Sequence, residues 1–193
     1  MSMIRAFIAV DLSTEVLCRL DDVYHQLKQR VPDRTVRWVP VKNIHLTLKF
    51  LGDVSESNLG VLYEILRKEA EKQTAFDIQV SGLGAFPSTN RPHVLWAGVQ
   101  APPDLAALQR AIDLETARIG YTSEDRDFSP HLTLGRVTRN ATPEEARRVG
   151  GALSNMQTGY LGTCRIKAVN FYRSDLNPQG SIYTRLYTAP FKP

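Results

Sequence analysis

The sequence predicts an α+β fold of two pseudo-symmetric lobes. Each lobe is a mainly antiparallel sheet with helices on its outer side, and a repeated strand motif faces a central cleft. The tetrapeptide His-Leu-Thr-Leu occurs twice, at 45–48 and 131–134, although the chain has only four histidines in 193 residues. The elements around the two copies also recur in the same order, which is helix, histidine strand, helix, strand, strand.

The elements of the first half follow from hydrophobic periodicity and breaker residues. A stretch of β-branched and aromatic residues predicts a buried strand. Ser13 is a typical helix N-cap, and Pro32 ends the apolar stripe that follows. We expect, in order, a strand over 4–11, a helix over 13–31, the first motif strand as far as residue 51, a helix from about 55, and strands over 76–82 and 93–99 joined by a loop.

The second half repeats this order. We expect a helix over 103–119, the second motif strand, a helix over 143–156, and strands over 162–173 and 181–188 separated by a turn at 177–180. The histidines at 45 and 131 are offset by 86 residues, as are the strand starts at 76 and 162. We therefore expect a single bilobal domain over 1–193, with an internal repeat of approximately 13–99 and 103–188.

Composition indicates a globular protein. Hydrophobic residues make up 42% of the chain and charged residues 23%, with a net charge of +4. A mildly basic surface favours an anionic partner but does not establish one. Cys18 and Cys164 form no metal-ligand spacing, so we expect free, buried thiols in a reducing compartment. With no signal peptide or membrane-length apolar run, we expect a cytoplasmic monomer without a membrane partner.

The repeated motif places chemistry on one face of a strand. Side chains alternate in a strand, so each histidine shares a face with the threonine two residues later, about 7 Å away. His45 is thus paired with Thr47, and His131 with Thr133. Two such strands would line a cleft with two imidazoles and two hydroxyls, a set suited to acid–base chemistry on an anion. Chance occupation of strand positions is the alternative, but a duplicated tetrapeptide argues against it.

Cleavage of a phosphodiester needs a base for the nucleophile and an acid for the leaving alkoxide. An imidazole pKa near 6.5 lets one histidine be neutral and another protonated near pH 7. Threonine hydroxyls can donate hydrogen bonds to phosphoryl oxygens. Arg136 would join the His131 face if the alternation broke at Gly135, and there its guanidinium could bind phosphate. Lys49 continues the His45 face as a further candidate cation, and Phe7 is either a core residue or a stacking platform for a base.

A metal site is the chemical alternative. Two histidines could bind zinc, but a catalytic zinc site needs a third protein ligand. No HExxH is present, and no acidic residue is repeated beside both histidines. We therefore expect no metal and no cofactor; Walker, GxGxxG and GxSxG motifs are also absent from the sequence.

The pattern resembles the 2H phosphoesterase superfamily, and within it the RNA 2′,3′-cyclic phosphodiesterases, also called 2′-5′ RNA ligases. The resemblance spans nearly the whole chain. It is carried by RAFIAVDL (5–12), RWVPVKNIHLTLKFLGDV (37–54), GLGAFPSTNRPHVLWAGV (82–99), FSPHLTLGRV (128–137) and the region of Tyr172, Ser174 and Tyr183. His93 departs from the pattern, since relatives more often carry arginine there.

The resemblance implies an RNA substrate with a 2′,3′-cyclic phosphate end and metal-independent hydrolysis to a 2′-phosphate. It makes His45 and His131 the catalytic acid and base, and Thr47, Thr133 and Arg136 the phosphate and substrate ligands. Phe7 would lie near the nucleobase. We take His131 as the base for water and His45 as the acid for the 3′ oxygen, although the near symmetry of the repeat permits the reverse.

Other functions fit the same motifs. Reversal of the reaction would join a 5′-hydroxyl end to the cyclic phosphate without ATP, giving a 2′-5′ linkage. A related enzyme could act on another cyclic phosphate or on 2′-5′ oligonucleotides. A non-catalytic RNA-binding module would keep the fold without turnover, and the two intact motifs argue against it.

Overall fold

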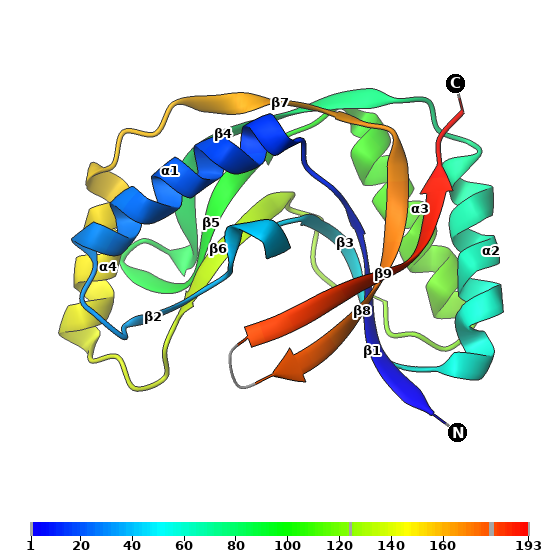
Figure 1. Cartoon of the computed structure of the whole chain (residues 1–193), viewed down its shortest axis with the longest axis horizontal. Helices are drawn as coiled ribbons and strands as arrows, with labels where there is room; N and C mark the ends of the chain where they lie inside the picture. Colours follow the sequence, from blue (N-terminus) through cyan, green and yellow to red (C-terminus); the bar gives the residue numbers. More distant parts are fainter. Residues whose placement is uncertain (1, 124, 178–179, 193) are drawn as a thin grey trace.

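The computed structural model describes residues 2–123, 125–177 and 180–192. In this part of the chain two antiparallel sheets form the centre of the molecule (Figure 1). The first sheet has the strand order β3-β1-β8-β9, with β3 Leu46–Ser55, β1 Met3–Val10, β8 Ala168–Asn177 and β9 Gly180–Pro190. The second sheet has the order β2-β6-β5-β4-β7, with β2 Val36–Trp38, β6 His131–Val137, β5 Arg91–Gln100, β4 Phe76–Ser88 and β7 Tyr160–Ile166.

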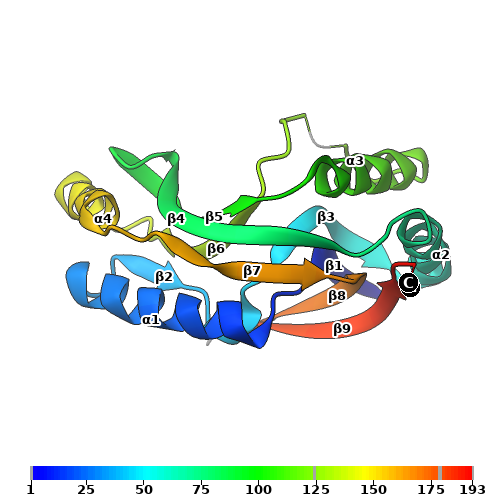
Figure 2. The same cartoon turned by 90° about the horizontal axis from the view of Figure 1, so that it is seen from above.

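Each sheet has its own pair of covering helices. The α-helices are α1 Thr14–Arg30, α2 Leu59–Ala70, α3 Pro103–Arg118 and α4 Pro143–Asn155, and the short 3-10 turns are η1 Val41–Asn43 and η2 Glu56–Asn58. Helices α2 and α3 pack on β3, β8 and β9, whereas α1 and α4 pack on β4, β5 and β7 (Figure 2). None of the helices in the described ranges is long and apolar enough to cross a membrane. The two-lobed α+β class predicted from the sequence is confirmed.

The two halves of the chain are interleaved between the sheets. The first motif strand, β3, lies in the sheet that contains the late hairpin β8–β9, and the second motif strand, β6, lies beside the early hairpin β4–β5. Each sheet therefore combines the histidine strand of one half with the hairpin of the other. The chain reaches this arrangement because Lys167 is the one residue between β7, in the second sheet, and β8, in the first.

That crossing corrects one sequence prediction. The stretch 162–173, expected as a single strand, is divided at Lys167 into two strands of different sheets. The buried apolar residues are Cys164 and Ile166 before the crossing but Val169 and Phe171 after it, so the alternation changes phase there, and the single-strand prediction did not use this sign. Of the turn predicted at 177–180, Pro178 and Gln179 lie outside the described residues.

Three further expectations change. The region between 82 and 93, expected as a loop, extends β4 to Ser88 and forms a hairpin with β5, since glycine and proline are tolerated in a bulged strand. The three-residue strand β2 was not predicted because it is too short for periodicity. Cys18 is exposed on α1, because it lies off the buried stripe of that helix; Cys164 is buried, and both thiols are free.

Helix α4 approaches the β4–β5 hairpin closely enough to require a glycine. A Cβ at Gly150 would lie 1.8 Å from the backbone oxygen of Thr89, which connects β4 and β5. A Cβ at the neighbouring Gly151 would meet nothing within 4 Å. The two adjacent glycines thus differ: Gly150 permits the contact, whereas Gly151 has open space beside its Cα.

We expect Gly150→Ala to lower the free energy of unfolding by about 2 kcal/mol, because the backbone of the hairpin must move away from the new methyl group. Gly151→Ala is the matched control and should raise stability by about 0.5–1 kcal/mol through helix propensity. Chemical denaturation of both variants measures the difference. Equal effects would mean that α4 does not contact the hairpin as described.

Candidate active site

The two motif histidines are held in the same way. His45 lies immediately before β3, and its Nδ1 is 2.7 Å from the backbone oxygen of Asn43. His131 begins β6, and its Nδ1 is 2.7 Å from the backbone oxygen of Ser129. A carbonyl oxygen can only accept, so Nδ1 donates in both rings and Nε2 remains for proton exchange. The repeated motif therefore fixes the same nitrogen for chemistry in both halves.

A β-bulge follows each histidine at the same place. In the β1–β3 pairing, Ala9 faces Thr47 and Ile8 faces Lys49, which leaves Leu48 as the extra residue. In the β5–β6 pairing, Trp96 faces Thr133 and Leu95 faces Gly135, which leaves Leu134 as the extra residue. An extra residue reverses the alternation of faces beyond it.

The bulges decide which side chains join the histidine face. Beyond the second bulge, Arg136 shares a cavity with His131 and Thr133, as the sequence analysis expected for an alternation broken near Gly135. Beyond the first bulge, the equivalent position is Phe50, five residues after His45. The side chains at these equivalent positions are an exposed aromatic ring and an exposed guanidinium.

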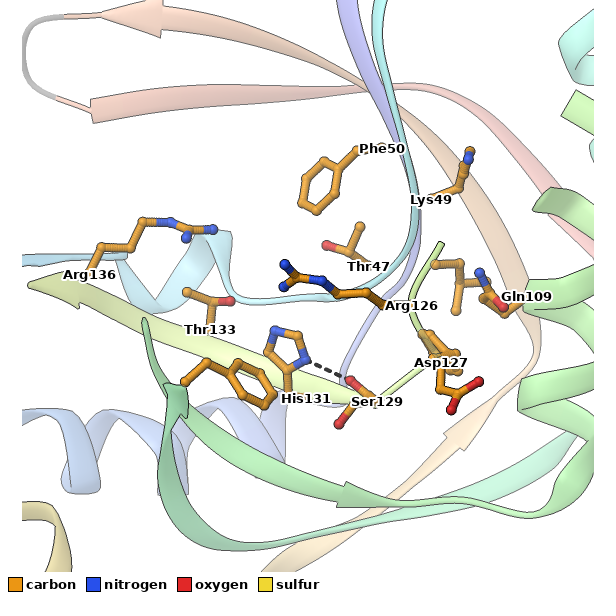
Figure 3. A pocket seen from close by; sticks show the side chains of 13 residues that line it. Thr47, Lys49, Phe50, Gln109, Arg126, Asp127, Ser129, His131, Thr133 and Arg136 are labelled. Atoms are coloured by element: carbon orange, nitrogen blue, oxygen red, sulfur yellow. Dashed lines mark hydrogen bonds between the residues drawn. The ribbon is translucent and has the colours of Figure 1, made fainter. Parts of the chain in front are cut away.

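A cavity of about 440 Å³ lies between the motif strands (Figure 3). Strands β3 and β6, which belong to different sheets, approach each other beside it. Both predicted threonines and one of the two histidines line it, and the lining residues are Thr47, Leu48, Lys49, Phe50, Phe86, Gln109, Arg126, Asp127, Phe128, Ser129, His131, Thr133 and Arg136. His45 is not among them; it lies two residues before Thr47, immediately before β3 begins. The volume suits a small organic ligand.

His45 packs in an aromatic cluster. Its ring stacks on Phe7 with centroids 4.6 Å apart and contacts the edge of Tyr183 at 5.3 Å. Phe7 also stacks on Tyr172 at 5.2 Å and contacts Phe50 at 6.3 Å. His131 has one aromatic neighbour of this kind among the described residues, Phe86, whose ring lies edge-on at 4.9 Å.

This cluster favours the core alternative for Phe7 over the stacking platform for a base. Phe7 shares the cleft face of its sheet, but only 3% of it is exposed because His45, Tyr172, Tyr183 and Phe50 surround its ring. Phe7 is instead the support on which the His45 ring rests. The exposed aromatic ring in the cavity is Phe50, at 59% exposure.

A network of polar contacts centred on Asp11 adjoins the aromatic cluster around His45. Tyr172 donates its hydroxyl hydrogen to Asp11 Oδ1 at 2.6 Å, and the Asn170 side-chain amide donates to Asp11 Oδ2 at 3.1 Å. Arg185 is 3.5 Å from the same carboxylate. Burial lowers the pKa of His45, while its bond to the Asn43 carbonyl and the charge of Asp11 raise it. Burial and the bond to Asp11 raise the pKa of Tyr172, which keeps its hydroxyl protonated as a donor.

Lys49 has a structural role that the sequence did not indicate. The bulge at Leu48 turns its side chain away from the His45 face, and only 1% of Lys49 is exposed. Its Nζ forms an ion pair with Asp113 of α3 at 2.5 Å and donates to the backbone oxygen of Thr122. The lysine therefore ties β3 to α3 and to the segment that follows α3.

The cavity also contains residues that sequence reasoning missed, namely Phe50, Phe86, Arg126 and Phe128. For Phe50 a signal existed, because it stands five residues after His45 as Arg136 stands after His131. No motif marks Arg126, which reaches the cavity from the segment between α3 and β6 (Figure 3). Phe128 lies in the same segment and opens the quoted stretch 128–137, but nothing in that stretch assigned it to the cavity. Within the described ranges no three His, Cys, Asp or Glu side chains gather as a metal site requires.

Comparison with known proteins assigns the family. The model of the LigT-like phosphoesterases matches residues 10–96 and 98–183, which together make up most of the chain. The chain belongs to the LigT-like phosphoesterases. This membership confirms the 2H phosphoesterase resemblance drawn from the repeated motif.

Relatives and solved structures agree along the full length of this phosphoesterase. It is 36% identical to the RNA 2′,3′-cyclic phosphodiesterase of Methanothermobacter thermautotrophicus over 94% of this chain and 95% of the relative. The Thermotoga maritima protein of the same name is 30% identical over 97% and 96%. The crystal structure of TT0787 of Thermus thermophilus superposes with a TM-score of 0.80 at 26% identity, covering 97% of both chains. E. coli LigT complexed with 3′-AMP shares the fold, with a TM-score of 0.78 at 24% identity over the whole of both chains.

The charge of Asp11 should be measurable at His45 of this LigT-like phosphoesterase. Asp11→Asn removes a carboxylate that favours the imidazolium, so we expect the His45 pKa to fall further and the ring to lose its proton at lower pH. Titration of the histidine ring signals by NMR measures this shift. Asp21→Asn is the matched control, because Asp21 lies on α1, 3.5 Å from His25, and its loss should leave the titration of His45 unchanged. An unchanged His45 pKa in Asp11→Asn would refute the coupling.

Proposed function

We propose that this protein hydrolyses RNA 2′,3′-cyclic phosphate ends to 2′-phosphates by metal-independent catalysis with two histidines. The observation that carries the proposal is the equivalence of His45 and His131, each with Nδ1 bonded to the carbonyl two residues earlier. The two relatives described above, both named RNA 2′,3′-cyclic phosphodiesterases, support the substrate class.

The cavity residues together with His45 offer groups for each part of an in-line displacement. Water attacks phosphorus, a base removes its proton, and the bond from phosphorus to the 3′ oxygen breaks as an acid protonates that oxygen. In our proposal the hydroxyls of Thr47 and Thr133 donate to the non-bridging oxygens, where negative charge accumulates. Arg136 supplies a guanidinium to the same anion. The product keeps phosphate on the 2′ oxygen, and both imidazoles return to their starting states after one proton exchange with solvent.

We assign the acid to His45 and the base to His131. Asp11 favours the imidazolium of His45, the form a general acid needs. Burial acts in the opposite direction and is the larger effect, so the imidazolium releases its proton more readily than a free one, and the negative charge of bound substrate must help to sustain it. A buried, readily released proton suits the leaving alkoxide.

The first test is hydrolysis of a short RNA with a 2′,3′-cyclic phosphate end in the presence of EDTA. We expect wild type to form the 2′-phosphate and His45→Ala and His131→Ala each to lose about 10²–10⁴-fold in rate. His25→Ala is the matched control, since His25 is an exposed residue of α1, and should retain activity. Turnover that needs a restored divalent ion would contradict metal-independent catalysis, and turnover unaffected by either active-site variant would contradict the two-histidine mechanism.

A second test separates acid from base. Replacing the bridging 3′ oxygen of the substrate with sulfur makes a thiolate leaving group, which departs without protonation because a thiol has a far lower pKa than an alcohol. We expect this substrate to restore most of the activity of His45→Ala but not that of His131→Ala. Rescue of His131→Ala instead would exchange the two roles.

A further inference from the structure

A basic groove adjoins the active-site cavity. It has a volume of about 430 Å³ and lies where β2, β6 and β5 run side by side. Its lining residues are Arg37, His93, Val94, Arg136, Val137, Thr138 and Arg139. Three arginines and a histidine thus face one small groove, and no acidic side chain is among the described residues that line it.

Two of these arginines oppose each other directly. Arg37 on β2 pairs with Arg136 on β6, so their side chains leave the same face of the sheet at neighbouring positions. Like charges at directly opposed positions repel and destabilise a sheet. Among the described residues neither guanidinium forms an ion pair with a carboxylate, whereas several arginines elsewhere do, at 2.6–2.8 Å. An anion between the two would remove the repulsion.

The groove continues the cavity. Arg136 lines both, together with His131 in the cavity and with Arg37 in the groove. A substrate held at the histidines by its cyclic phosphate has only one direction for the rest of its chain, since the cyclic phosphate closes the 3′ end. The next phosphodiester lies on the 5′ side of the terminal nucleotide.

We propose that this groove binds the RNA backbone on the 5′ side of the terminal nucleotide, with Arg37 and Arg139 as its phosphate ligands. The inference rests on the proposed function, and it makes an oligonucleotide rather than a mononucleotide the preferred substrate. His93 adds a hydrogen-bond donor at the rim. Guanidinium groups bind phosphate through paired N–H donors, which suits them to a backbone read without regard to base.

The kinetic test compares a nucleoside 2′,3′-cyclic phosphate with di-, tri- and tetranucleotides that end in the same group. In wild type we expect kcat/KM to rise at least tenfold with the first one or two added phosphates and then level off, because the groove is short. In Arg37→Gln/Arg139→Gln most of that rise should disappear. Arg110→Gln is the matched control, because it removes an exposed arginine of α3 in the other lobe. The proposal is wrong if kcat/KM of wild type does not depend on substrate length, or if Arg110→Gln loses the length dependence as fully as the double variant does.

A binding test does not depend on catalysis. Fluorescence anisotropy with a labelled trinucleotide that ends in a 2′-phosphate measures affinity for the product, which is not turned over. For single-stranded nucleic acid, each neutralised phosphate contributes about 0.7 to the slope of log K against log salt, so the double variant should lower that slope by about 1.4. If wild type hydrolyses no cyclic phosphate but shows this slope change, the proposed function fails and the groove stands. Turnover of the cyclic phosphate with an unchanged salt slope in the double variant would support the proposed function and refute the groove.

Discussion

The extra residue three positions after each motif histidine determines the composition of the site. Without the bulges at Leu48 and Leu134, strict alternation would turn Lys49 toward the cleft and Arg136 away from it. The bulges are possible because both leucines remain buried, at 3% and 0% exposure, so the local irregularity costs no apolar burial. The cleft positions of Phe50 and Arg136 and the internal ion pair of Lys49 all follow from these two bulges, a kind of irregularity that proteins commonly use to redirect a side chain near a site.

The interleaving of the sheets makes the cleft a shared product of both halves. Each sheet combines the histidine strand of one half with a hairpin of the other, so neither lobe is a continuous segment of chain. The side chain of Asn43 strengthens this dependence, because it donates to the backbone oxygen of Ser181 at 2.8 Å while its own carbonyl holds His45. The first catalytic candidate is thereby connected to β9, near the end of the sequence. The internal duplication stays a prediction, consistent with this layout.

The sequence was sufficient where a local pattern determined the outcome. The helices followed their apolar stripes and caps, and the repeated tetrapeptide located the threonines of the cavity. It was insufficient where a side chain's surroundings come from distant strands. Phe7 resembles any strand phenylalanine until Tyr172 and Tyr183 close around it, and Lys49 resembles a surface cation until α3 supplies Asp113. The crossing at Lys167 was missed because the change of phase between Ile166 and Val169 is also what a bulge within one strand produces.

That crossing has a mechanical consequence. A connection of one residue between β7 and β8, with the Lys167 carbonyl accepting from the Phe191 backbone at 2.8 Å, gives the two sheets almost no slack relative to each other. Lobes joined by a long linker would swing, and the reacting groups would have to be gathered for every turnover. Here the separation of the motif strands is set during folding. The entropy of bringing the two imidazoles together is then lost once, when the chain folds, and does not reduce the free energy of each binding event.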